Sequence, residues 1–198
     1  MILEGIVTTL AADGSVHVAP MGPLVDSTPN DNDWRRFVLR PFQTAQTYRN
    51  LVAHPEGVLH VTDDVLLLAR AAVGALDPPP PLVPATRVRG HVLRDCCRWY
   101  EFRIVARDDS AERARLDAEV VHAGRGRDFF GLNRAMHAVV EAAILATRLG
   151  FVPRAEVDAA YRQLAVLVEK TGGPREREAF AFLEEYVRRA VKPRAAGE

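Results

Sequence analysis

The chain has 198 residues, 48% of them hydrophobic and 26% charged, so it can bury the core of one large domain or of one medium domain with an appendage. Its basic and acidic residues balance to a formal net charge of zero, which excludes a global basic field that would attract nucleic acid. No apolar run approaches the roughly 20 residues that span a membrane, and the opening MILEGIVTTL lacks the basic start of a signal peptide, so we expect a cytoplasmic protein with no membrane partner.

Short apolar runs rich in β-branched residues, separated by turn residues, occupy the chain up to residue 107 and are typical of strands. The dipeptide Asp13-Gly14 lies between the first two runs and predicts a hairpin. Helical spacing predicts short helices at 44–54 and 63–74, and the proline-rich stretch 76–84 predicts an extended loop. The predicted strands are 3–10, 16–20, 35–41, 57–62, 86–93 and 98–107, and the last two are expected to pair.

From residue 108 the apolar residues follow helical spacing. The predicted helices are 110–124, 130–150, 154–173 and 174–192. Strands followed by helices predict an α+β fold with segregated layers. We therefore expect a small antiparallel barrel in a domain of residues 1–107, with a helical region of residues 108–198 packed on it.

The second predicted strand runs into Ala19, Pro20, Met21 and Gly22. Proline cannot donate a hydrogen bond to a ladder, so the strand is expected to stop there. Small side chains would let a flat ligand approach the backbone, and the thioether of Met21 offers a polarizable contact to an aromatic ring. The alternative is an edge strand that ends in a turn.

The segment RPFQTAQTYRNL places Arg40 at the end of a predicted strand, and Thr44 and Thr47 in or just before the first turn of a predicted helix. A guanidinium, two hydroxyls and the free N–H groups of a helix N-terminus can together bind an anion. The segment is therefore a candidate phosphate site. In the alternative interpretation, Thr44 is only the helix N-cap and Arg40 is a solvated strand end.

Polar residues recur on one face of the predicted helix 130–150. Asn133, His137 and Glu141 are four residues apart, and Arg134 and Arg148 lie close to the same face. Such a face either lines a site or is solvated. His137 and Glu141 have no evident third ligand, so we expect no metal.

The two cysteines of the chain, Cys96 and Cys97, are adjacent. Adjacent cysteines do not easily form a disulfide, so reduced thiols are expected. Farther along, Arg125 and Arg127 flank Gly126 in a predicted connection between helices, where they could reach an anion.

Six segments resemble, in matching order, a flavin-binding split-barrel family that is catalogued as a domain of unknown function, number four-four-seven. They are ILEGIVTTL, DGSVHVAPMGP, RPFQTAQTYRNL, VLHVTDD, RWYEFRI and LNRAMHAVVEAAILATRL. Relatives of that family include flavin reductases and pyridoxamine-phosphate oxidases. The resemblance implies a six-stranded antiparallel split β-barrel that binds flavin mononucleotide (FMN), usually as a homodimer with the flavin near the subunit interface.

The resemblance also assigns roles to the candidate residues. The strand end Ala19, Pro20, Met21 and Gly22 would lie near the isoalloxazine ring, and Arg40, Thr44 and Thr47 would hold the phosphate. Thr62 and Asp63 would approach the ring or the ribityl chain. Asn133 and the helix that carries it would line the outer wall of the site. No residue is assigned a catalytic role, because hydride transfer at a flavin requires no acid or base from the protein.

Two flavin-dependent functions, and as a third a helical interaction module on a cofactor-free barrel, remain open at this point. In the first, the protein is an FMN-dependent oxidoreductase that exchanges hydride or electrons with a nicotinamide or another small redox substrate. In the second, it is a flavin-binding accessory, carrier or sensor without turnover of its own.

Overall fold

The computed structural model describes residues 1–25 and 34–190. Its elements fall into two compact units, which are described separately. The first unit comprises residues 1–62 and 79–129, and the second comprises residues 63–78 and the chain from residue 130 onward. The α+β class expected from the sequence is confirmed: strands make up the first unit and helices most of the second.

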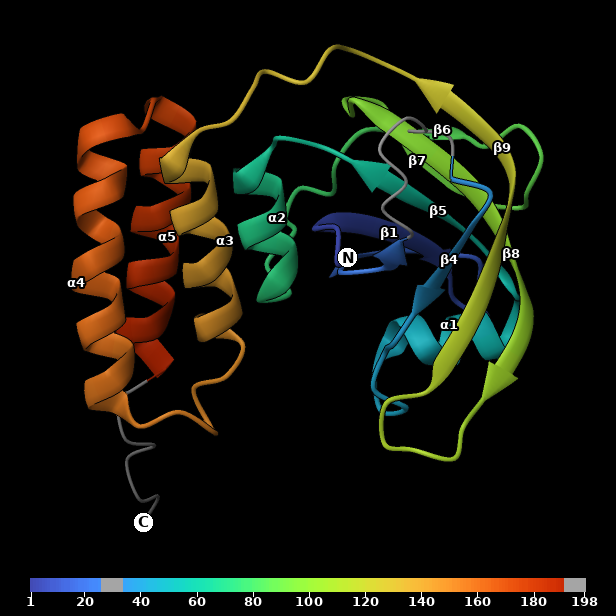
Figure 1. The fold of residues 1–198 in the computed structure, drawn as a ribbon, viewed down its shortest axis with the longest axis horizontal. Helices are drawn as coiled ribbons and strands as arrows, with labels where there is room; N and C mark the ends of the chain where they lie inside the picture. The colour runs from blue at the N-terminus through green and yellow to red at the C-terminus, as the bar shows by residue number, and fades with distance from the viewer. Residues whose placement is uncertain (26–33, 191–198) are drawn as a thin grey trace. The chain divides into compact units, whose positions relative to one another are not determined.

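The first unit contains an antiparallel sheet of seven strands that curls on itself (Figure 1). The strands, in their order across the sheet, are β2 (Val16–Met21), β1 (Gly5–Leu10), β5 (Glu56–Val61), β8 (Arg98–Asp108), β9 (Arg115–Arg125), β4 (Arg36–Leu39) and β3 (Leu24–Val25). The count of seven corrects the six strands expected from the sequence.

The additional strand arises from a bend in one segment. β2 pairs with β1, whereas β3, only two residues farther along the chain, pairs with β4 on the other side of the sheet. The N–H of Leu3 donates to the carbonyl of Pro23 at 3.1 Å, and the N–H of Val25 donates to the carbonyl of Met1 at 2.9 Å. One bent segment therefore forms both ends of the strand order and brings them together.

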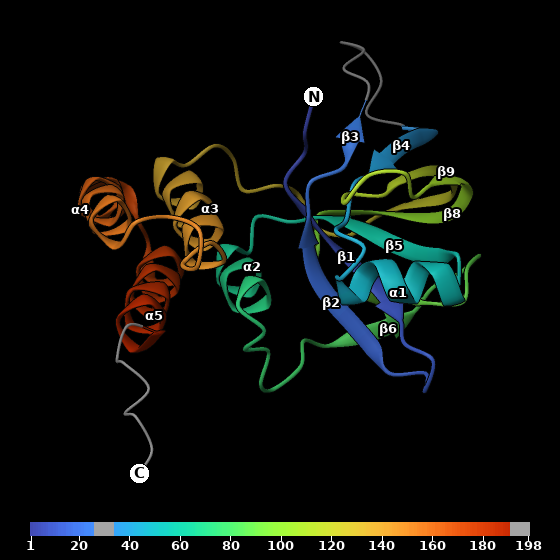
Figure 2. The same ribbon diagram turned by 90° about the horizontal axis from the view of Figure 1, so that it is seen from below.

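The inner face of this sheet buries a cluster of apolar side chains that alternate along each strand. Its members include Val7, Phe37, Leu59, Tyr100, Phe102 and Leu116. The rings of Phe37 and Phe102 meet edge to face with centroids 5.2 Å apart. Helix α1 (Gln46–Ala53) lies alongside β1 and β2 in Figure 2 and adds Leu51 to the cluster.

A second, two-stranded sheet of β6 (Leu82–Pro84) and β7 (His91–Leu93) packs beside β1 and β5. The sequence predicts that residues 86–93 pair with residues 98–107, and this prediction is wrong. Strand β7 pairs instead with β6, inside the stretch that was predicted to be a loop. Pairing within 82–93 closes only a short loop, so it costs little chain entropy.

Residues 110–124, which were predicted to be a helix, form most of the hairpin partner of β8 instead. Alanine, glutamate and arginine favour helices, and their abundance here produced the wrong prediction. The burial pattern nevertheless has the period of a strand, because Leu116 and Ala118 face the core between Arg115, Asp117 and Glu119. Long-range pairing of β9 with both β8 and β4 overrides the local preference.

The second unit consists of α2 (Val65–Ala72), α3 (Arg134–Ala146), α4 (Arg154–Thr171) and α5 (Pro174–Ala190). Each of these helices was expected from the sequence, but α2 was expected in the domain of residues 1–107. Asp64 caps α2, its carboxylate accepting from the N–H of Leu67 at 3.0 Å. The hydroxyl of Tyr161 donates to the carbonyl of Ala142 at 2.8 Å inside the helix packing. No described helix is both long and apolar enough to cross a bilayer. The division expected after residue 107 falls inside β8.

Candidate functional site

One end of the curled sheet is hollow. Strand pairing aligns Val61 with Arg98, and Arg98 with Arg125, so the ends of β5, β8 and β9 lie in one row. Two cavities of about 480 and 410 Å³ lie at this row, and Trp34, Arg98 and Arg125 line both of them. Each volume falls within the range of about 300–1,000 Å³ that is usual for small-molecule sites.

The larger cavity, here called the edge slot, follows the free edge of β9. The pairing of β9 with β4 stops at Glu119, and the N–H of Val120 makes one further bond, to the carbonyl of Arg35 at 2.9 Å. Beyond it, residues 121–125 have no ladder partner on this side among residues 1–25 and 34–190. Alternate peptide groups of an antiparallel edge point away from the sheet, so this edge can bind a ligand through its backbone.

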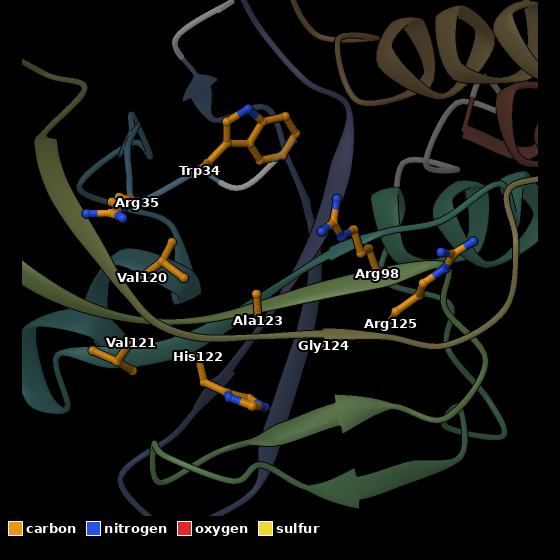
Figure 3. A pocket seen from close by; sticks show the side chains of 9 residues that line it. All are labelled: Trp34, Arg35, Arg98, Val120, Val121, His122, Ala123, Gly124 and Arg125. Atoms are coloured by element: carbon orange, nitrogen blue, oxygen red, sulfur yellow. The ribbon is translucent and has the colours of Figure 1, made fainter. Parts of the chain in front are cut away.

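A β-bulge sets the directions of the side chains along this edge. The register of β8 and β9 shifts between Glu101 and Phe102, which leaves Val121 as the extra residue. Figure 3 shows the side chains of Val120 and Ala123 on the side of β9 that faces Trp34, whereas His122 projects from the other side. The edge slot thus has an apolar wall opposite an indole ring.

The smaller cavity, here called the inner chamber, has aromatic and cationic walls. Besides the three shared residues, it is lined by Val61, Cys97, Tyr100, Arg127, Asp128 and Phe129. The rings of Trp34 and Tyr100 lie with centroids 5.1 Å apart, and the guanidinium carbon of Arg98 lies 5.8 Å from the centre of the Tyr100 ring. These rings offer a flat apolar surface next to positive charge.

Four arginines gather around the two cavities, although the whole chain has no net charge. The Nε of Arg127 donates to Asp95 at 2.6 Å and its Nη1 lies 3.4 Å from the sulfur of Cys97, which fixes this guanidinium. Arg125 forms an ion pair with Asp128. The other two arginines are Arg35 and Arg98. Guanidinium groups at the walls of the two cavities favour an anionic ligand.

The two cysteines are free thiols in different surroundings. Burial, followed by the charges of Cys97 and Asp95, raises the pKa of the Cys96 thiol to about 12. Cys96 therefore stays protonated and unreactive near neutral pH. Cys97 lies at the wall of the inner chamber, beside Arg127.

The structure brings Met21 and Thr62, two of the residues that the resemblance places near the flavin, to this end of the sheet. Met21 packs against the apolar cluster that contains Tyr100, as do Trp34 and Val61, and Thr62 directly follows Val61. The strand ends within the expected stretch, because β2 runs through Pro20 and stops at Met21. A proline is tolerated there since β2 lies at one end of the sheet's strand order, where one side needs no ladder bond.

The remaining residues of that strand end have structural roles. Ala19 and Pro20 pair with Val7 and Ile6 of β1. A Cβ at Gly22 would lie 2.8 Å from a methyl carbon of Ile2, so the close approach of the two segments requires glycine. Contact of these residues with a flavin stays a prediction.

The predicted phosphate segment lies elsewhere in the unit. Arg36 begins β4 near the edge slot, whereas Arg40 follows the far end of that strand, so the structure does not bring Arg40 to the cavities. Thr44 is exposed and is not the helix cap; that position belongs to Ala45, which makes no side-chain cap bond. Thr47 is 3% exposed. Phosphate binding by these residues stays a prediction.

Two further candidates belong to the helical unit. A carboxylate oxygen of Asp63 accepts from the N–H of Phe130 at 2.8 Å. Asn133 caps α3 by accepting from the N–H of Ala135 at 2.7 Å, and its amide donates to the carbonyl of Thr171 at 3.0 Å. Both side chains thus stabilise their own unit, and a cofactor role for either stays a prediction.

The polar face of α3 is solvated, because Arg134, His137, Glu141 and Arg148 are all exposed. Among the described residues, no three His, Cys, Asp or Glu side chains are placed to hold a metal ion.

The residues that line the cavities were mostly missed from the sequence. Arg125 and Arg127 had been noted as able to reach an anion, but Trp34, Arg35 and Arg98 had not been singled out. One signal was present: in RWYEF, Arg98 and Tyr100 alternate and must share a face once the segment is a strand.

Comparison with known families now identifies the chain's relatives. Residues 3–127 match the N-terminal domain, and residues 133–185 the second domain, of a family described as protein of unknown function (DUF447). The chain belongs to the DUF447 family. No curated protein matches it.

Solved structures with the same fold include another DUF447 protein. An FMN-bound DUF447 protein from Methanosarcina mazei is 23% identical with a TM-score of 0.79, and the match covers 93% of this chain and 94% of that chain. A flavin reductase domain protein from Arthrobacter is 16% identical with a TM-score of 0.54, covering 65% of this chain and 80% of that one. A 2-nitrobenzoate 2-nitroreductase from Pseudomonas fluorescens is 17% identical with a TM-score of 0.50, covering 62% and 64%.

Proposed function

We propose that this DUF447 protein binds FMN at the hollow end of its curled sheet and uses it as an oxidoreductase. The observation that carries the proposal is the pair of adjoining cavities, which place four arginines around two aromatic rings and a free strand edge. The FMN-bound relative from Methanosarcina mazei, similar over nearly the whole chain, supports the choice of cofactor.

In this proposal the phosphate of FMN is held by Arg98, Arg125 and Arg127, in place of the segment that carries Arg40, Thr44 and Thr47. Arg127 is fixed in place by Asp95, so little side-chain entropy is lost when it binds an anion. A charge-assisted hydrogen bond contributes about 1.5–3 kcal/mol, and two or three of them would hold the phosphate firmly.

The ring system of FMN would lie against Trp34 and Tyr100. Its flat faces suit the indole and phenol rings, and its polar edge suits the free peptide groups of β9. When bound, FMN supplies hydride and electron transfer, and the protein supplies binding and orientation. The walls of the cavities need not provide an acid or a base for that chemistry.

The direct test is the visible absorption spectrum of the purified protein, followed by the mass of any released cofactor and by titration with FMN. Bound FMN is expected to give a yellow protein. Arg98→Gln should raise the Kd for FMN about tenfold or more, because one charge-assisted bond is lost. Arg103→Gln is the matched control, since Arg103 lies on the same strand but pairs with Glu56 away from the cavities.

A colourless protein that takes up no FMN would refute the proposal. A protein that binds FMN but whose photoreduced flavin is reoxidised only by oxygen, whatever small redox compound is offered, would favour the accessory or carrier function over the oxidoreductase.

We also propose that the protein forms a homodimer. The ring of Phe129, which is 48% exposed, is an apolar surface that a second copy could cover. Light scattering during size-exclusion chromatography measures the mass in solution, and a monomer at micromolar concentration would contradict this part of the proposal.

A further inference from the structure

The edge slot has positive charge at both ends. Arg35 stands at one end beside Val120, and Arg98 and Arg125 stand at the other end beyond Gly124, as Figure 3 shows. Between the two ends, the wall is made of the small apolar side chains of β9, opposite Trp34. A slot of this kind suits a ligand, or a pair of ligands, that is flat in the middle and anionic at both ends.

One FMN molecule cannot neutralise both ends. Val120 and Arg125 are five residues apart on β9, which corresponds to about 17 Å of strand. Exposed charges are screened beyond about 8–10 Å at physiological salt, so a phosphate bound at Arg125 has little effect at Arg35. FMN carries a single phosphate, and its ring system is uncharged when oxidised. The Arg35 end therefore remains available for a second anion.

The place of Arg35 is set by the backbone. Its carbonyl accepts from the N–H of Val120, which is the last bond between β9 and the segment leading into β4. The next residue, Arg36, begins β4 and lies 3.9 Å from Glu119 in an exposed ion pair. Arg36 is not among the residues that line the edge slot, so two adjacent arginines differ in what they can bind.

We propose that the Arg35 end of the edge slot binds the carboxylate or phosphate of a planar, anionic substrate, which lies along the free edge of β9 next to the flavin. This inference rests on the proposed FMN site and adds the chemical class of the substrate. Arg35 acts as a positioning residue for the reaction, because it holds the substrate's charged group and not its reacting atoms.

The test uses three simple probes on the FMN-loaded protein. Benzoate carries a planar carboxylate, phenyl phosphate a planar phosphate, and benzamide is a neutral counterpart of benzoate. Binding is followed as a change in the flavin absorption spectrum. At least one of the two anions should give a saturable change, with benzamide about tenfold weaker or more, and the stronger anion identifies the charged group.

Arg35→Gln should weaken binding of that anion about tenfold or more, while the Kd for FMN changes less than about twofold. Arg36→Gln is the matched control and should leave both affinities unchanged. Raising the salt concentration should weaken the anion in the wild-type protein more than in Arg35→Gln.

Several results would overturn the inference. One is a flavin spectrum that neither anion alters, and another is benzamide binding as tightly as benzoate. A third is an equal loss of FMN and anion affinity in Arg35→Gln, which would make Arg35 part of the cofactor site. If the wild-type protein binds no FMN, the proposed function fails instead, and titration of the FMN-free protein with the same anions, followed by tryptophan fluorescence, decides whether Arg35 binds them.

Discussion

The polar groups on the two faces of strand β8 have different surroundings. On the inner face, Arg98 lines both cavities next to Tyr100. On the outer face, the Glu101 carboxylate is fully buried and accepts from the backbone N–H groups of Thr86, Arg87 and Val88, at 2.8, 2.5 and 3.1 Å.

The same contrast extends to the neighbouring strand β5. His60 is fully buried, its Nδ1 lying 3.1 Å from the carbonyl of Ile6 and its Nε2 accepting from the N–H of Leu93 at 3.0 Å. Together, Glu101 and His60 tie the β6–β7 segment to the sheet. A polar group satisfied inside the fold stabilises it, whereas a polar group that faces a cavity is available to a ligand. Substitutions on the two faces should therefore change different quantities.

The largest effect is expected for Glu101→Ala. Three N–H groups lose their acceptor, that of Val88 in a buried hydrogen bond and those of Thr86 and Arg87 in part-buried ones, and each unsatisfied donor costs about 1–3 kcal/mol, so the free energy of unfolding should fall by about 3 kcal/mol or more. Urea unfolding followed by tryptophan fluorescence measures it. Glu119→Ala is the control, because its exposed pair with Arg36 contributes at most about 1 kcal/mol.

If Glu101→Ala does not fold, Glu101→Gln provides the measurement, since it keeps one acceptor oxygen. Equal stability of Glu101→Gln and the wild type would show that the carboxylate is not what holds the 86–88 segment.

The next largest effect is a decrease in the free energy of unfolding at low pH, which we attribute to His60. Burial lowers the pKa of His60 from 6.5 to about 4, so the unfolded chain binds a proton at a pH where the folded protein does not. The contribution of neutral His60 to the free energy of unfolding is complete above pH 6.5. It is lost as the pH falls toward 4, which lowers the free energy of unfolding by about 3 kcal/mol in all. Burial also lowers the pKa of His17, which acts in the same direction.

Urea unfolding at several pH values between 7 and 4 tests this effect. The slope of unfolding free energy against pH should be smaller in His60→Gln, because glutamine at position 60 does not titrate. An unchanged slope in His60→Gln would assign the acid sensitivity to other groups.

A smaller effect is expected for Gly124→Ala, because Gly124 lines the edge slot and also lies against Trp99. A Cβ at Gly124 would lie 2.0 Å from a ring carbon of Trp99 on the face opposite Trp34, so the indole must move. Such overpacking costs about 1–3 kcal/mol, visible as a lower Tm. Gly150→Ala is the control because it has open space around it. Equal Tm values for the two variants would contradict the close packing of Trp99.

The smallest effect is expected on the exposed face of α3. Glu141→Gln and His137→Gln should change the free energy of unfolding by less than about 0.5 kcal/mol and leave the Kd for FMN unchanged, because both residues are exposed. A clear loss of FMN affinity in either variant would support the original interpretation of this face as a wall of the site.

The sequence predicted the elements whose own pattern is strong. Asp13-Gly14 predicted the first hairpin, and helical spacing predicted α2. Strand β9 was missed because its alanines and glutamates favour a helix, and only its partners β8 and β4 make it a strand.

The cavities were missed for a related reason. Their walls come from residues 34–35, 61, 97–100 and 120–129, which are brought together only by the register of the strands. The resemblance pointed to the correct family, but residue patterns alone could not show which arginines face the hollow end of the sheet.

The bend at Gly22-Pro23 has a consequence for the order in which the sheet can close. It joins residues 1–3 to residues 23–25, which are about twenty positions apart, whereas β4 and β9 are about eighty positions apart. The first junction therefore closes at low entropic cost and the second at a higher one. In the part of the chain that the structure describes, the pairing at this second junction also stops at Val120. The edge slot therefore lies at the junction of β4 and β9, which is the slower one to close.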